Sequence, residues 1–302
     1  MRFAVLASPD SWYARDLIRA AGAAHEVVVL PFSEISASIG LETIAPPGTM
    51  VSTAGRNLAD FDAVLVRTMP PGSLEQVVFR MDCLWRYEAA GGVVINPARA
   101  IEAAVDKFLT SAKLQHAGLD TPRTICCQTA DEAMLAFAQL GGDVVLKPLF
   151  GSEGRGITRL TDENLALRAF KMLMQLGAVL YLQEFIAHEG HDIRLLVLGE
   201  KILGMQRINK LDWRTNISRG AAAEAFSPDD ALIDLARRAA AAVHAPLAGV
   251  DLLPGNDGRL YTIEVNAVPG WKGLANALNV DVASQVIEFV ASKVHEGQRN
   301  AP

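Results

Sequence analysis

The fold is decided by Gly249–Asn266, GVDLLPGNDGRLYTIEVN. Two apolar runs flank the turn Asn256–Gly258, which is the strongest local signal of a β-hairpin. Glu264 and Asn266 are two apart on one strand and project from the same face, and Asp251 comes almost opposite them on the partner strand. Three oxygen donors so placed suit Mg²⁺ or Mn²⁺. An exposed polar hairpin face explains this stretch, taken alone, equally well.

A second hairpin lies upstream and carries basic residues. Its strands are expected at 194–198 and 201–206, on either side of a two-residue turn that contains glycine. Arg194 and Arg207 come at similar places in the two strands, and an Arg-Thr-Asn loop follows at 214–216. Surface arginines are usually only solvated, but several that converge beside a metal ion would offset the charge of a triphosphate.

Lysine and glycine residues indicate a phosphate site farther upstream. Lys147 ends an apolar strand and is followed by the loop Gly151–Gly156, whose backbone N–H groups could surround phosphates. The sequence has no G-x-x-x-x-G-K-[ST], which excludes the common P-loop, and an isolated glycine-rich loop is often a plain turn. Lys107 follows Asp106 at a helix start and could reach a phosphate, although a capped helix with a solvated lysine is the ordinary explanation.

The first third of the chain alternates short apolar runs with stretches of helical period. This alternation predicts an α/β domain with a parallel sheet. Four strands are expected, at 2–7, 27–30, 63–66 and 93–95, and Asn96-Pro97 marks the end of the domain. An α+β unit and a hairpin-rich unit follow. The predicted divisions are 1–98, 99–185 and 186–302.

Composition restricts the class of protein. The 302 residues are 50% hydrophobic and 21% charged, as in ordinary globular proteins, and the net charge of −6 argues against a nucleic-acid surface. No apolar run approaches the roughly 20 residues of a membrane span, so we expect a cytoplasmic protein without membrane contact. Cys83, Cys126 and Cys127 form neither an even disulfide set nor a metal pair. His188 and His191 have no third partner, which favours exposed loop histidines over zinc.

The motifs follow one another in a specific order over more than half of the chain. They are Asp106-Lys107, Leu146–Pro148 with Gly151–Gly156, Gln183–Ile186, Asp192–Arg194, Arg214–Asn216 with Arg219-Gly220, Gly249–Asp251, and Glu264–Asn266 with Pro269-Gly270. In this order the set resembles the ATP-grasp superfamily and, more narrowly, the RimK-type α-L-glutamate ligases. The resemblance implies a mixed α/β and α+β architecture, in which an N-terminal parallel α/β domain precedes two α+β subdomains that sandwich ATP.

The resemblance also implies roles for individual residues. Asp251, Glu264 and Asn266 would hold two Mg²⁺ or Mn²⁺ ions. The residues with catalytic roles, at the phosphate and acyl-phosphate region, would be Arg194, Arg207, Arg214 and Asn216. The nucleotide would contact Lys107, Lys147, Gly151, Ser152, Gly154, Gly156, Gln183, Glu184, Phe185, Ile186, Asp192, Arg214, Thr215 and Asn216.

The implied activity is an ADP-forming ligase that joins a carboxylate to an amine through an acyl phosphate. Glutamate would be one substrate and a small molecule or peptide the acceptor, in a homodimer or homotetramer. The chain departs from the pattern at 267–273, where no serine precedes Pro269 and Trp271 adds a planar face. This variant is similar to relatives linked with tetrahydromethanopterin pathways, whose acceptors carry pterin or furan rings.

Several alternatives stay open at this point. One is a ligase for another amino acid, a carrier protein or a D-alanyl dipeptide, and another is a nucleotide-binding regulatory protein without catalysis. Four arginines of the N-terminal part could recognise an anionic acceptor, although ordinary surface solvation is preferred for each. They are Arg15, Arg67, Arg80 and Arg99.

Overall fold

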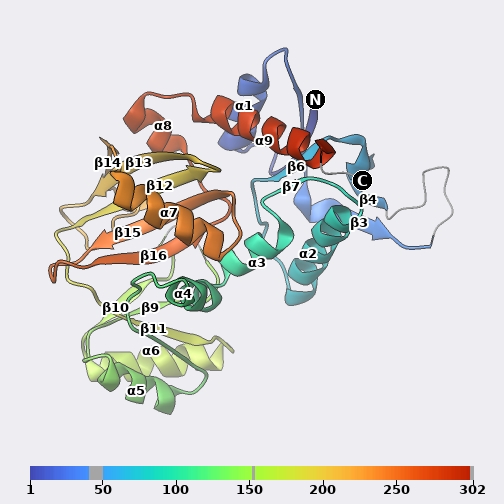
Figure 1. The fold of residues 1–302 in the computed structure, drawn as a ribbon. Coiled ribbons are helices and arrows are strands. Elements are labelled where there is room, and N and C mark those ends of the chain that lie inside the picture. The colour runs from blue at the N-terminus through green and yellow to red at the C-terminus, as the bar shows by residue number, and fades with distance from the viewer. Residues whose placement is uncertain (41–49, 152–153, 300–302) are drawn as a thin grey trace.

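The structure is a computed structural model and describes residues 1–40, 50–151 and 154–299. Its N-terminal domain is built on a parallel sheet of strand order β2-β1-β6-β7, as the alternation of apolar runs predicted (Figure 1). Phe3 and Val5 of β1 belong to one hydrophobic cluster and Ala4 and Leu6 to another, because successive side chains of a strand point to opposite faces. The elements are β1 (Arg2–Leu6), α1 (Trp12–Ala21), β2 (Glu26–Leu30), β6 (Ala63–Val66), α2 (Leu74–Ala89) and β7 (Val94–Ile95).

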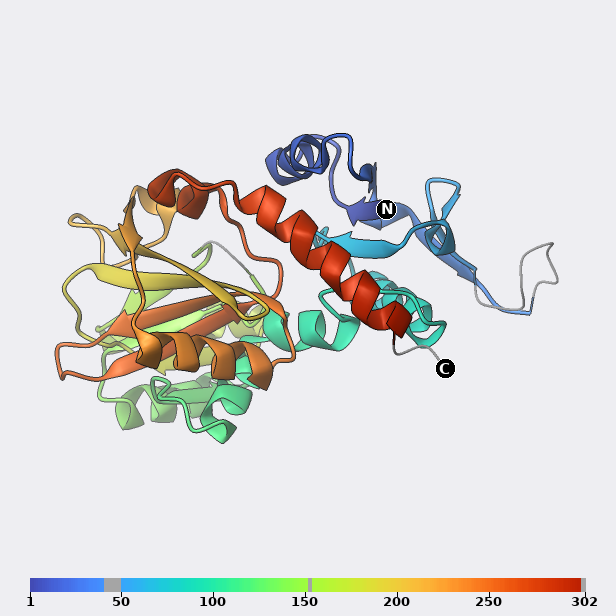
Figure 2. The same cartoon turned by 45° about the horizontal axis from the view of Figure 1, so that its top comes forward.

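A small antiparallel sheet extends from this domain and was not predicted from the sequence (Figure 2). It consists of β3 (Ile35–Ser38), β4 (Met50–Thr53) and β5 (Arg56–Asn57). The strands are short and rich in serine and threonine, so they lack the apolar runs by which the other strands were recognised.

The central subdomain has an antiparallel sheet of order β10-β9-β11-β8 with two helices on one face. Leu146 and Leu182 face these helices together with Phe137 and Phe170, so the neighbouring positions on β9 and β11 face the other way. The elements are β8 (Thr124–Cys127), α5 (Ala130–Gln139), β9 (Val144–Lys147), β10 (Thr158–Leu160), α6 (Glu163–Gln175) and β11 (Leu180–Glu184). Two helices, α3 (Ala98–Val105) and α4 (Lys107–His116), connect this subdomain to the N-terminal domain (Figure 1).

The C-terminal subdomain has a five-stranded antiparallel sheet of order β14-β13-β12-β15-β16. Both predicted hairpins are confirmed, and their strands extend beyond the expected ends. Leu195 and Val250 pack toward the helix α7, whereas Asp192 and Arg194 lie on the opposite face. The elements are β12 (His191–Leu198), β13 (Lys201–Ile208), β14 (Ala222–Phe226), α7 (Asp230–Ala242), β15 (Leu247–Pro254), β16 (Leu260–Asn266), α8 (Lys272–Leu278) and α9 (Val282–Arg299).

The last helix joins distant parts of the molecule. Figure 2 shows α9 running from the C-terminal subdomain across the N-terminal domain, where it contacts α1 and β6. Val286 and Val290 are buried there against Leu17 and Leu65. The predicted boundaries at 98 and 185 therefore leave α9 in the third unit by sequence, while it packs against the first unit as well as the third. In the described residues no helix is both long and apolar enough to cross a membrane.

Candidate active site

A cleft of about 880 Å³, part of which is open solvent, lies between the central sheet and the C-terminal sheet. Arg194 and Asn266 do not line it, nor do Gly151 and Gly156, and Ser152 lies outside the described residues. Fourteen of the predicted site residues do. They are Lys107, Lys147, Gly154, Gln183, Glu184, Phe185, Ile186, Asp192, Arg207, Arg214, Thr215, Asn216, Asp251 and Glu264.

Lys147 lies on the cleft face of β9, where its neighbour Gln183 fixes it. Its Nζ donates to Oε1 of Gln183 at 2.5 Å, and Nε2 of Gln183 donates in turn to the hydroxyls of Thr124 and Tyr181. Burial lowers the pKa of Lys147 to about 8, although Glu264 acts in the opposite direction. Burial makes the charged form of Lys147 unfavourable, and an anion such as phosphate bound beside it would stabilise that form.

Lys107 begins α4 and contacts the glycine-rich loop. Asp106 caps the helix by accepting from the N–H of Leu109, as expected, and Nζ of Lys107 donates to the carbonyl of Gly151 at 2.7 Å. Burial lowers the pKa of Lys107. The two cleft lysines therefore lie beside the loop that was predicted to surround phosphates.

The glycine-rich loop approaches the opposite wall closely at Gly154. This residue has φ of +70°, and a Cβ placed on it would come within 2.5 Å of Oδ1 of Asn216. The left-handed backbone favours glycine here, and any larger residue would also have to displace the Asn216 side chain.

A chain of alternating charges crosses the C-terminal sheet. Arg207 donates to Asp192 at 2.7 and 2.5 Å, and its Nη2 also lies 3.0 Å from Oδ2 of Asp251. Arg194 pairs with the same Asp251 through two hydrogen bonds. Arg194 was expected at the phosphates, but the structure places it behind the cleft lining, beside Gly249 and Pro269.

The ionisation of these groups follows from burial and pairing. Burial raises the pKa of Asp192 more than Arg207 lowers it. Burial also opposes ionisation of Asp251, but Arg194 and Arg207 outweigh it and hold its pKa below the usual value. The pKa of Arg207 is above its usual range, because the two carboxylates outweigh its own desolvation. Arg207 is therefore a fixed cation in the wall of the cleft.

The predicted metal ligands occupy neighbouring positions. Asp251 pairs with Glu264 in the register of β15 and β16, and Asn266 follows two residues later on the same face. Within the described residues no cluster of three or more His, Cys, Asp or Glu side chains suits a metal ion, and the predicted set has only two carboxylates, with the amide of Asn266 as its expected third donor. Oδ1 of Asn266 accepts from the N–H of Val268 at 2.8 Å. Hard oxygen donors of this kind fit Mg²⁺, which would compete with the two arginines for Asp251.

The loop at 214–216 connects to the same network. Oγ1 of Thr215 donates to Oδ2 of Asp192 at 2.5 Å, which fixes the loop against β12. Arg214 lines the cleft, yet its guanidinium pairs with Asp212 at 2.5 Å. In this structure Arg207 is thus the more rigidly held of the two cations.

Several residues of the cleft were not predicted. The expectation that His188 is an exposed loop residue is wrong, because it is half-buried and lines the cleft next to Phe185, with ring centroids 6.0 Å apart. Trp213 meets the Phe185 ring edge-on at 5.7 Å. Two of the missed positions could have been predicted, because Val145 on β9 and Tyr181 on β11 lie two residues from Lys147 and Gln183 and so share their face of the sheet. The missed lining residues are Pro122, Val145, Ile157, Tyr181, His188, Trp213, Leu253 and Ile263.

Two expectations outside the cleft are corrected by burial. Trp271 does not present an open planar face, because none of it is exposed and Arg67 covers its ring at 4.3 Å. Surface solvation is also wrong for Arg67 and Arg80, of which 5% and 4% are exposed. Arg80 donates to the carbonyl of Pro70. Arg67 therefore packs against the loop that contains Trp271, and Arg80 holds the segment that contains Pro70.

Comparisons with known proteins agree with this geometry. The family model of the RimK-like ATP-grasp domain matches residues 104–290. The tetrahydromethanopterin:α-L-glutamate ligase of Methanosarcina acetivorans is 31% identical, over 94% of this chain and 97% of that protein. The ribosomal protein bS6–L-glutamate ligase of Escherichia coli is 28% identical, over 96% of this chain and 95% of that protein.

A solved structure gives the same fold. The ATP-grasp ligase PsnB, complexed with a minimal precursor, Mg and ADP, has a TM-score of 0.74 at 23% identity, over 97% of both chains. The predicted architecture, an α/β domain followed by two α+β subdomains, is confirmed by this similarity.

Proposed function

The chain belongs to the RimK-like ATP-grasp family, and from this premise we propose that it joins L-glutamate to a small acceptor molecule, with ADP and phosphate as the other products. The family supports the coarser statement, an ATP-dependent ligase that uses Mg²⁺. The observation that carries the proposal is the meeting of Lys107, Lys147 and Arg207 with Asp251 and Glu264 in one cleft.

In the proposed first step, an oxygen of the carboxylate substrate attacks the γ-phosphorus of ATP. The bond to the β-phosphate oxygen breaks, so ADP leaves and an acyl phosphate forms. Repulsion between the two anions is the main obstacle, and Lys107, Lys147 and Arg207 would reduce it. Asp251, Glu264 and Asn266 would hold Mg²⁺, two ions per site, which would supply further charge neutralisation.

In the second step, the amine nitrogen attacks the acyl carbon, and phosphate leaves as the amide forms. The amine proton passes to solvent or to phosphate. Water would compete with the amine, so the loop that contains Gly154 would have to exclude it from the acyl phosphate. Lys107 already bonds that loop through the Gly151 carbonyl, which supports a role for the loop as a cover.

The acceptor is proposed to be a carboxylate attached to a pterin or a related ring. The support is the identity to the tetrahydromethanopterin ligase over almost the whole chain. The bS6 ligase supports a second candidate, the carboxylate of a peptide. Whichever acceptor is used, we propose that the enzyme is a homodimer or a homotetramer. Analytical sedimentation would test the oligomeric state.

The test is an assay of ADP release with ATP, Mg²⁺ and glutamate, together with one acceptor of each class. We expect ADP release that requires both glutamate and the pterin-linked carboxylate, and a product heavier by glutamate residues. Incorporation into a peptide ending in glutamate would favour the second candidate. ADP release that does not depend on glutamate, with any acceptor, would count against the proposal.

A further inference from the structure

The loop 267–273 is held from outside its own subdomain at every second residue. Nδ2 of Asn96 donates to the carbonyl of Ala267 at 2.6 Å, and Nη2 of Arg67 donates to the carbonyl of Pro269 at 2.7 Å. Nε1 of Trp271 donates to Oδ2 of Asp16 at 3.0 Å. All three partners belong to the N-terminal domain.

These partners lie at the edge of the N-terminal sheet where its strands end. Arg67 directly follows β6 and Asn96 directly follows β7, while Asp16 is on α1. In open parallel sheets this carboxyl edge is the usual place for ligands. Here the loop 267–273 occupies part of that edge, so it lies between the sheet and the cleft.

The loop is held tightly at its centre. The Arg67 guanidinium lies between two rings, 4.3 Å from the centroid of Trp271 and 5.0 Å from that of Tyr13. Nε and Nη1 of Arg67 are buried and have no hydrogen-bond partner in the part of the chain that the structure describes. At Gly270 a Cβ would come within 2.5 Å of the Tyr13 hydroxyl oxygen. The fit therefore leaves little freedom to the backbone from 269 to 271.

The other side of the loop contacts residues that lie behind the charged end of the cleft without lining it. Val268 donates its N–H to Asn266, and Pro269 packs beside Gly249, which also contacts Arg194, the partner of Asp251. A displacement of the loop would therefore be passed to Asn266 and to Arg194, the partner of Asp251. Residues 184–186, which the resemblance places at the nucleotide, are not connected to the loop by these contacts.

We propose that Asp16, Arg67 and Asn96 are positioning residues that set the loop 267–273 and thereby the affinity for the acceptor. The inference rests on the proposed function, since it assumes that a second substrate binds beside the charged end of the cleft. It goes further by assigning part of the acceptor specificity to the N-terminal domain, through residues that do not line the cleft.

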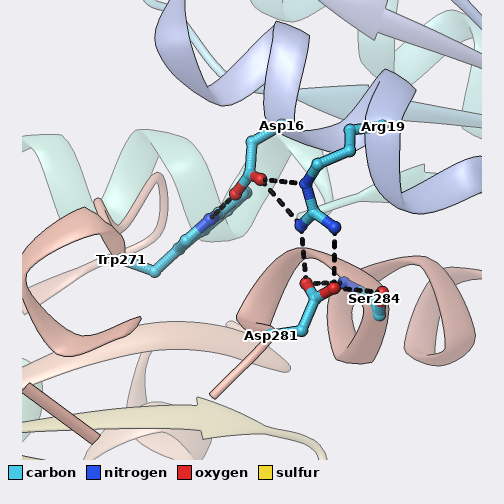
Figure 3. A network of polar contacts seen from close by, with 5 residues as sticks. All are labelled: Asp16, Arg19, Trp271, Asp281 and Ser284. Atoms are coloured by element: carbon cyan, nitrogen blue, oxygen red, sulfur yellow. Dashed lines mark hydrogen bonds and ion pairs between the residues drawn. The ribbon is translucent and has the colours of Figure 1, made fainter. Parts of the chain in front are cut away.

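Figure 3 shows a matched pair of positions for the test. Asp16 contacts both Trp271 and Arg19, whereas Arg19 contacts Asp16 and Asp281 but not Trp271. Asp16→Ala removes the bond to the indole. Arg19→Ala breaks the exposed ion pairs of the same network and leaves that bond in place. Asp16→Asn keeps an oxygen that can accept from the indole and serves as the rescue variant.

The kinetic experiment compares KM for ATP, glutamate and the acceptor. We expect Asp16→Ala and Arg67→Met to raise the acceptor KM by about tenfold, as the loss of one buried hydrogen bond implies, with the KM for ATP unchanged. Arg19→Ala and Asp16→Asn should stay within about twofold of the native acceptor KM. An unchanged acceptor KM in Asp16→Ala, or a rise confined to glutamate or ATP, would overturn the inference.

A second measurement does not depend on catalysis. Hydrogen–deuterium exchange of the peptide covering 267–273 should become faster in Asp16→Ala and Arg67→Met but not in Arg19→Ala. Unchanged exchange in the first two variants would show that the loop is not held as proposed. If the native enzyme ligated nothing, the proposed function would fail, while the exchange result would still decide whether the loop is positioned from the N-terminal domain.

Discussion

At the scale of single residues, Glu264 is the side chain whose removal should separate chemistry from stability. It is half-buried, lines the cleft and lies opposite Asp251 in the register of β15 and β16. We expect Glu264→Ala to abolish ADP release in the presence of both substrates, because the proposed metal ligand is lost, while the urea midpoint changes little. Glu224→Ala on β14 is the control, since this exposed glutamate is on the same sheet but outside the cleft. Near-native turnover of Glu264→Ala would exclude the assigned role.

Lys147 should give the enzyme a basic limb in its pH profile. Its pKa of about 8 means that the ammonium loses its proton as the pH rises through this value, so affinity for ATP should fall above it by up to about tenfold per pH unit. For stability the sign is opposite: the cost of burying the ammonium is present below about pH 8 and decreases above it.

Replacement of Lys147 tests this assignment. Lys147→Arg should remove the fall in affinity above pH 8, because a guanidinium remains charged, and Lys147→Met should weaken ATP binding at every pH. Titration calorimetry with a non-hydrolysable ATP analogue would measure both, with Lys171→Met on the exposed side of α6 as the control. A basic limb that persists in Lys147→Arg would assign the titration to another group.

At the scale of elements, β12, β13 and β15 are joined by charge as well as by backbone hydrogen bonds. Arg207 is buried between Asp192 and Asp251. Arg207→Met should therefore cost about 3–5 kcal/mol in unfolding free energy, because, within the described part of the chain, the buried Asp192 loses its only arginine partner and Asp251 keeps only Arg194. The exposed pair of Arg123 with Glu184 offers the comparison, and Arg123→Met should cost less than about 1 kcal/mol. Urea denaturation would measure both, and similar costs would contradict the explanation.

The same elements show what the sequence can and cannot predict. The period of two along a strand was enough to place Glu264 and Asn266 on one face and Asp251 opposite. The pairing of Asp192 with Arg207 was missed, although counting outward from the two-residue turn after Leu198 gives this register. Burial of Trp271 could not be predicted, because its partner Asp16 is 255 residues away in the sequence. Contacts of that kind depend on how whole domains meet.

At the scale of the whole molecule, α9 determines how strongly the N-terminal domain is bound to the rest. Ile287 is buried in the cluster it shares with β1 and α1, while Glu288 beside it is exposed. We expect Ile287→Ala to lower the unfolding free energy by about 2–5 kcal/mol. Glu288→Ala should change it by no more than about 0.5 kcal/mol. Denaturant titration would distinguish them, and equal effects would mean that α9 packs only loosely.

The position of α9 also has a consequence for biosynthesis. The first sheet is complete once residue 95 has been made, yet the face that α1 covers in part receives the rest of its cover only with residues 282–299. Domains usually fold in the order in which the ribosome delivers them. Here the cover of β1 and β6 is completed only after both ATP-grasp subdomains have been synthesised, so we expect part of their apolar face to be open to chaperones for most of translation.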